Sequence, residues 1–161
     1  MTDPGRETRR SDLFMPALLD RLSQRASATI TRSAFRKSVL RDLSWLLNCT
    51  NLETQLPLDG FPHAKYSVLN FGIPSLAGYR FSESELSDMA KRIELALAYF
   101  EPRILKDSLK VSVANDKSAS LYNLARFRIE ATYWFEPYPL DMVIRAQWDM
   151  DAGNVEIREE S

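Results

Sequence analysis

The spacing of apolar residues changes once along this chain, and that change limits the folds it can adopt. Before about residue 100 they recur every three or four positions, as on a helix, and after about residue 109 they alternate, as on a strand. Helices first and strands afterwards predict an α+β fold, in which N-terminal helices and one long central helix pack on a small antiparallel sheet formed by the C-terminal half. With 161 residues the chain suits one domain, and we expect a disordered arm over 1–12 and a single domain over 13–161.

The central helix is predicted over about 82–100. Its apolar residues are Leu86, Met89, Ala90, Ile93, Leu97 and Phe100, which share one stripe. Ser82 and Glu85 have the spacing of a capping box at its start, and Pro102 ends it. Further helices are expected over 13–22 and 33–48. Residues 49–62 read as a loop, and 63–79 as a turn-rich connector with at most one helical turn, near 67–69.

The strands follow from alternation. A short strand is expected over 109–113, then a turn at 115–118 and a strand over 124–135 with Phe127, Ile129, Ala131, Tyr133 and Phe135 on its buried face. After a corner at 136–139, the next strand buries Met142, Ile144, Ala146, Trp148 and Met150. A hairpin at 151–154 leads to a last short strand, Val155, Glu156 and Ile157.

Composition excludes several classes of protein. No apolar run has the roughly 18 residues of a membrane span, and no apolar leader stands at the N-terminus, so we expect a cytoplasmic protein. The lone Cys49 excludes an internal disulfide and is expected to be a small buried hydrophobic residue. Residues 1–41 carry nine Lys/Arg against four Asp/Glu, while 149–160 carry one against five. The basic residues are scattered over helical segments, which favours oriented protein partners over nucleic acid.

Constellations for catalysis are scarce in this sequence. The one histidine, His63, stands beside Pro62 and is expected to be a loop residue making a structural hydrogen bond. Neither zinc spacing nor a phosphate-binding glycine loop is present, so no metal, cofactor or catalytic residue is predicted. Glu130 and Glu136 flank aromatic strand positions, which keeps a lysozyme-like glycan hydrolase open as an alternative. Alternation nevertheless places Glu130 on the solvent face.

Glu101 is the anomalous residue, because a carboxylate at a helix C-terminus faces the negative end of the helix dipole. One interpretation is a surface pair with Arg103, which contributes little. The other is a functional site, because local rules broken without visible compensation tend to mark function.

Three motifs in order resemble the TssE family, the small baseplate subunits of bacterial type VI secretion systems, which are related to a wedge protein of contractile phage tails. They are Trp45-Leu46-Leu47-Asn48, the run Ser67–Pro74 with Leu76 and Gly78, and Phe100-Glu101-Pro102-Arg103. The resemblance covers most of the chain from about residue 13.

This resemblance implies a cytoplasmic, non-enzymatic, baseplate-wedge-like domain that helps to start polymerisation of the contractile sheath. It implies docking through Glu101, Pro102 and Arg103 into wedge subunits (TssF, TssG and TssK), and contact with sheath proteins. Such docking also gives the charge of Glu101 a reason, since the partner would supply the compensation missing within the chain. On that basis, replacing Glu101 or Arg103 by Ala is expected to abolish docking and leave the isolated fold nearly unchanged. The edge strand of Val155, Glu156 and Ile157 is a candidate for strand addition by sheath subunits. An anti-adaptor with the same fold is a further alternative.

Overall fold

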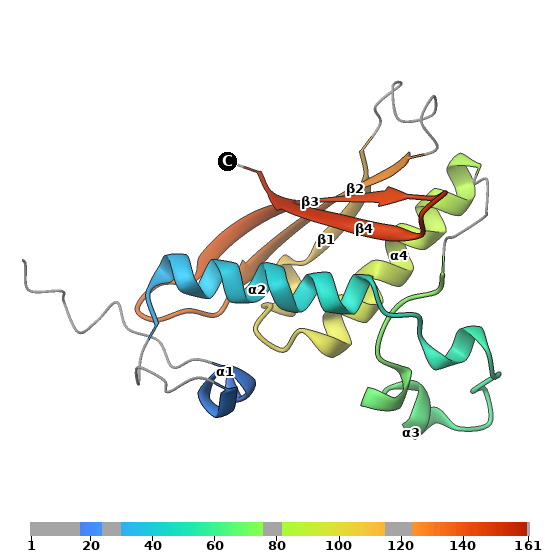
Figure 1. Cartoon of the computed structure of the whole chain (residues 1–161), viewed down its shortest axis with the longest axis horizontal. Helices are drawn as coiled ribbons and strands as arrows, with labels where there is room; N and C mark the ends of the chain where they lie inside the picture. The colour runs from blue at the N-terminus through green and yellow to red at the C-terminus, as the bar shows by residue number, and fades with distance from the viewer. Residues whose placement is uncertain (1–16, 24–29, 76–81, 115–123, 161) are drawn as a thin grey trace, which may run out of the picture.

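The structure is a computed structural model that describes residues 17–23, 30–75, 82–114 and 124–160 (Figure 1). The expected arm over 1–12, the beginning of the first helix, Leu76, Gly78 and the turn at 115–118 lie outside these residues. The helices are α1 (Leu18–Ser23), α2 (Arg32–Leu47), α3 (Pro62–Lys65) and α4 (Glu83–Phe100). The strands are β1 (Lys110–Val113), β2 (Leu124–Tyr133), β3 (Leu140–Asp149) and β4 (Asn154–Glu159). The α+β prediction is confirmed.

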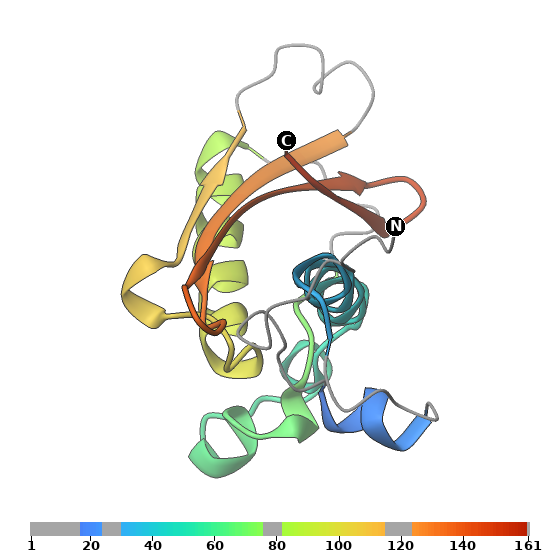
Figure 2. The ribbon, with the colours of Figure 1, turned by 90° about the vertical axis from the view of Figure 1, so that its left-hand side faces the viewer.

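The four strands form one antiparallel sheet in the order β1-β2-β3-β4. The central pair is in register over its whole length, from Leu124 opposite Asp149 to Tyr133 opposite Leu140. The sheet is strongly curved, and α2 and α4 both pack on the face that carries the core (Figures 1 and 2).

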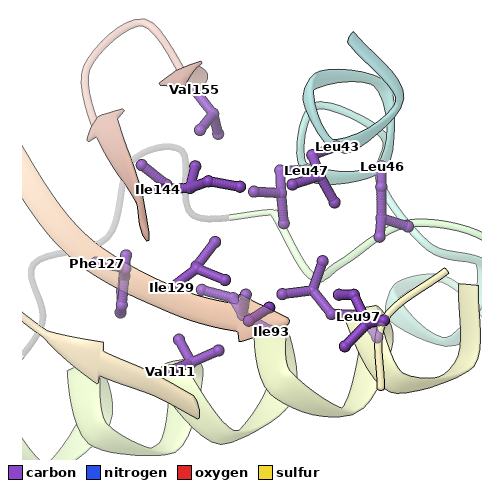
Figure 3. Packing of buried hydrophobic residues seen from close by; sticks show 14 of the residues in the cluster. Leu43, Leu46, Leu47, Ile93, Leu97, Val111, Phe127, Ile129, Ile144 and Val155 are labelled. Atoms are coloured by element: carbon purple, nitrogen blue, oxygen red, sulfur yellow. The ribbon is translucent and has the colours of Figure 1, made fainter. Parts of the chain in front are cut away.

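The predicted alternation of the two long strands is confirmed by burial. The core residues are Ala125, Phe127, Ile129, Ala131 and Tyr133 in β2, and Leu140, Met142, Ile144, Ala146 and Trp148 in β3. Phe135 and Met150, predicted within the strands, are buried but lie just beyond the ends of β2 and β3. Figure 3 shows leucines of α2 and Ile93 and Leu97 of α4 meeting Ile129 and Ile144 of the sheet. Burying one such side chain contributes about 1.5–3 kcal/mol, so this core supplies most of the stability.

The boundaries of α4 are the predicted ones. The Ser82 hydroxyl accepts a hydrogen bond from the Glu85 backbone at 3.4 Å, and the Glu85 carboxylate accepts one from the Ser82 backbone at 2.8 Å. The helix ends at Phe100, two residues before Pro102.

The connector contains more helix than the sequence predicts. Besides the 3-10 turn at Val68–Asn70, α3 forms at Pro62–Lys65, because Pro62 stands at its first turn, where its fixed φ suits a helix. His63 therefore lies exposed in α3 and not in a loop.

The prediction of a buried Cys49 is wrong, because α2 ends at Leu47 and Cys49 is exposed beyond the helix. The connector returns to this point through a parallel bridge between Thr50 and Ile73. Gly72, with φ of 121°, makes that approach possible, since a Cβ there would lie 2.3 Å from the Cys49 carbonyl oxygen.

Candidate functional site

Glu101 and Arg103 form a buried bidentate ion pair at the end of α4. Arg103 donates from Nε to Glu101 Oε1 at 2.6 Å and from Nη2 to Oε2 at 2.5 Å. The Arg103 backbone N–H also donates to Oε1, at 3.1 Å. Two parallel bonds between charged groups fix both the distance and the orientation of the pair.

This geometry answers the anomaly of charge at the helix end. The pair predicted from the sequence exists, but it is not a surface pair, since only 5% of Glu101 is exposed. The expectation that the compensating charge comes from a partner is wrong, because Arg103 supplies it within the chain. The Glu-Pro-Arg turn therefore has a structural role within the chain, because its ion pair is buried in the fold.

Helix α2 extends the pair into a network. Asp42 accepts from Arg103 Nη2 at 2.8 Å, and Ser38, one turn earlier on the same face, lies 3.4 Å from Arg103 Nη1. Burial alone would lower the pKa of Arg103, but hydrogen bonds and charge from Glu101, together with Asp42, raise it. Arg103 thus stays charged and joins the end of α4 to the middle of α2.

A second arginine continues the network to α1. Arg41 donates to Asp42 Oδ1 from Nε at 2.9 Å and from Nη2 at 2.7 Å. It also donates to Asp20 from Nη1 at 2.5 Å and from Nη2 at 3.2 Å. Hydrogen bonds from Arg41 lower the pKa of Asp20, so its carboxylate stays ionised. The guanidinium lies 4.8 Å from the centre of the Trp45 ring.

Aromatic side chains form the floor below the network. The Arg103 guanidinium lies 5.7 Å from the centre of the Phe35 ring, which packs edge-on against Tyr133. Burial, then the charge of Glu101, raises the pKa of Tyr133, and Arg103 opposes that rise. Among the described residues, the Tyr133 hydroxyl is the one buried side-chain polar atom without a hydrogen-bond partner.

A hollow of about 510 Å³ lies beside the network. Its lining combines charged groups of the network with apolar side chains from α1, α2 and the connector: Ala17, Leu19, Ile30, Phe35, Ser38, Arg41, Asp42, Leu43, Trp45, Leu46, Phe71, Phe100, Glu101, Pro102 and Arg103. Pro102 is exposed at this hollow, between the buried Glu101 and the partly buried Arg103. The surface is thus concave and mainly apolar, and ion pairs at its rim hold it in shape.

The other candidate, the β4 edge, is longer than predicted and partly covered. The Asn48 side chain accepts from the Val155 N–H at 2.8 Å and donates to the Val155 carbonyl at 3.1 Å. The Glu160 backbone N–H donates to the Val143 carbonyl of β3. In an antiparallel pair such bonds involve every second residue, so the backbone groups of even-numbered β4 residues bond to β3 and those of odd-numbered residues point away from it. Glu156 therefore bonds inward, while Ile157 and Glu159 present the outward backbone groups.

The carboxylates considered for glycan hydrolysis do not come together with a buried acid. Glu130 is half-buried on the polar face and pairs with Arg128, and Glu136 is exposed. Over the described residues, no group of three or more His, Cys, Asp or Glu side chains is placed to hold a metal ion. Nor is any helix of that part long and apolar enough to cross a membrane.

Comparison with known families decides the assignment. Residues 33–138 match the family described as baseplate wedge protein gp25. The chain belongs to this family. The match contains α2 except its first residue, the connector, α4 with the Glu-Pro-Arg turn, β1 and β2, and it ends just before β3. It agrees with the resemblance to TssE, the type VI secretion homologue of gp25. A comparison with curated protein sequences gives no match.

Membership in the gp25 family places the chain among structural proteins of phage-tail-like baseplates. Sequence reasoning found Glu101, Pro102 and Arg103 but missed Asp20, Ser38, Arg41 and Asp42, since no local pattern joins Asp42 to a residue 61 positions away. It also missed the hydrogen bonds between the Asn48 side chain and the Val155 backbone, although Asn48 ends the first motif. An asparagine just after a helix suggests a C-cap, and the Asn48 amide does donate to the Ser44 carbonyl in the last turn of α2, at 2.8 Å.

Proposed function

We propose that this gp25-family chain is a TssE-type baseplate subunit of a type VI secretion system. It works in the cytoplasm, docks into the wedge formed by TssF, TssG and TssK, and helps to start polymerisation of the contractile sheath. In this proposal the docking surface is the Glu101-Pro102-Arg103 turn with the adjacent hollow. The β4 edge serves the sheath through the outward backbone groups of Ile157 and Glu159.

The observation that carries the docking proposal is an exposed proline held rigidly at an apolar hollow. The Glu101 backbone N–H donates to the Leu97 carbonyl of α4 and the Arg103 side chain donates to Asp42 of α2, so the backbone between Glu101 and Arg103 has little freedom. A rigid surface loses little conformational entropy on binding, which favours affinity. The hollow offers apolar side chains to a partner, and the ion pairs of its rim give that partner a defined orientation.

The test replaces Pro102 by Asp. This variant puts a charge on the proposed docking face and leaves both members of the buried pair in place, so we expect the wild-type melting temperature. Because an unpaired charge is costly in an apolar interface, co-purification with TssF and TssG should be lost. Co-expression followed by affinity purification measures it.

Pro57→Asp is the matched control, since Pro57 is also exposed and lies in the loop after α2. It should co-purify like the wild type. Full recovery of TssF and TssG with Pro102→Asp, in a folded protein, would contradict the proposed docking surface.

A further inference from the structure

The Arg41 guanidinium is held in a geometry that suits a carboxylate, and contacts other than those with Asp20 help to hold it there. Asp42 fixes it from one side through two hydrogen bonds, and the Trp45 ring lies against its face. The remaining edge, with Nη1 and Nη2, binds the two oxygens of Asp20. A planar guanidinium held in this way suits any carboxylate that approaches along that edge.

Asp20 belongs to α1, a short helix with largely exposed leucines. Helix α1 has six residues, too few for a stable helix without tertiary packing. Leu18 and Leu22, one turn apart, are 67% and 77% exposed. Asp20 joins α1 to α2 through its hydrogen bonds with Arg41 and Ser38. Leu19 of α1 lines the hollow but does not fill it, since the hollow has a volume of about 510 Å³.

We propose that Arg41 and Trp45 form a binding position for a carboxylate, filled by Asp20 in the free chain and by an acidic side chain of the wedge partner in the baseplate. This inference rests on the proposed docking at the Glu-Pro-Arg turn and adds a specific chemistry to it. The partner segment carries an Asp or Glu flanked by large apolar side chains, which enter the hollow that α1 leaves open.

The charge of Arg41, and the fact that the hollow also includes Pro102 and Arg103, favour an acidic occupant over a purely apolar one. Once α1 is displaced, Arg41 would keep one carboxylate, Asp42, and expose two donors at the rim of an apolar surface. Leaving such donors buried without a partner is costly, so an interface that covers them requires an acceptor. The same hollow includes Pro102 and Arg103, so one continuous partner surface covers both positions.

The experiment measures the affinity of the full chain for purified TssF–TssG complex by calorimetry. Asp20→Asn weakens the internal competitor and leaves Arg41 in place, so we expect binding several-fold tighter than wild type. Arg41→Lys keeps the charge but loses the bidentate fork, so it should bind several-fold more weakly. The double variant should lose the gain given by Asp20→Asn. Asp88→Asn, which removes an exposed ion pair with Lys91 on α4, is the control and should bind like wild type.

Each outcome separates this inference from the proposed docking. If Asp20→Asn binds more weakly than wild type, α1 is itself part of the docking surface and the inference is overturned. Unchanged affinity in Asp20→Asn or in Arg41→Lys also overturns it. If the folded wild-type chain does not bind the complex at all, the proposed function fails first.

Discussion

At the scale of single residues, Glu101 shows how a charge that opposes a helix dipole is accommodated. The cation two residues later turns back over the carboxylate, so the positive charge that the C-terminus of α4 favours is present after all. The pairing of Glu101 with Arg103 could be predicted from their spacing. Its burial could not, because Asp42 and Phe35, which cover Arg103, belong to a helix distant in sequence.

Burial changes what substitution of Glu101 does to the isolated domain. Removing one member of a buried pair typically costs about 3–5 kcal/mol, and Arg103 keeps Asp42, so we expect about 3 kcal/mol for Glu101→Gln. Urea denaturation should show this as a lower midpoint with an unchanged slope. Glu130→Gln, which breaks the more exposed pair with Arg128, is the control and should cost less than about 1 kcal/mol.

Equal stability of the two variants would show that the buried pair contributes no more than a surface pair. The result also governs how docking experiments are read. Loss of wedge binding in a Glu101 variant reports on folding and docking together, whereas Pro102→Asp reports on docking alone.

At the scale of elements, both edges of the sheet are partly closed by side chains from the helices. Asn48 at the end of α2 bonds to both backbone groups of Val155 on β4, and Glu94 of α4 accepts from the Val111 N–H of β1 at 3.1 Å. Arg36, near the beginning of α2, pairs with Glu159 at the other end of β4. Such covers protect edge strands from unwanted pairing. Strand addition to β4 therefore has to begin at Ile157.

Ile157→Pro tests sheath initiation at this edge. The N–H that it removes points away from β3, so the hairpin stays paired and the protein should fold and bind TssF–TssG. A proline at 156 would instead break a bond to β3. We expect cells with Ile157→Pro to form no sheaths, scored as fluorescent sheath structures.

The control is Ile157→Ala, which removes similar packing and keeps the N–H, and it should form sheaths. Normal sheath assembly with Ile157→Pro would mean that strand addition here is not the mechanism.

At the scale of the whole molecule, the sequence was sufficient wherever structure follows from a local period. The stripe of α4 and the alternation of β2 and β3 each repeat over ten or more residues, and α4 also carries a capping box at its start. The network was not predictable in this way, since it joins α1, α2 and the end of α4. Contacts between distant segments leave no spacing in the sequence, and only folding brings them together.

The same whole-molecule view bears on the lysozyme-like alternative. A glycosidase acid needs a carboxyl group in an apolar pocket, without a neighbouring cation, so that it stays protonated. In the described part of the chain, Glu101 is the one carboxylate classed as buried, and Arg103 binds both of its oxygens. Both oxygens of this carboxylate are therefore engaged within the chain, and neither is presented to a substrate. We therefore expect no cleavage of purified peptidoglycan between about pH 4 and about pH 8, a range that includes raised carboxyl pKa values near 6. Release of reducing sugars measures cleavage, with a purified lysozyme as the positive control. Cleavage that disappears in Glu130→Gln or Glu136→Gln would contradict a purely structural role.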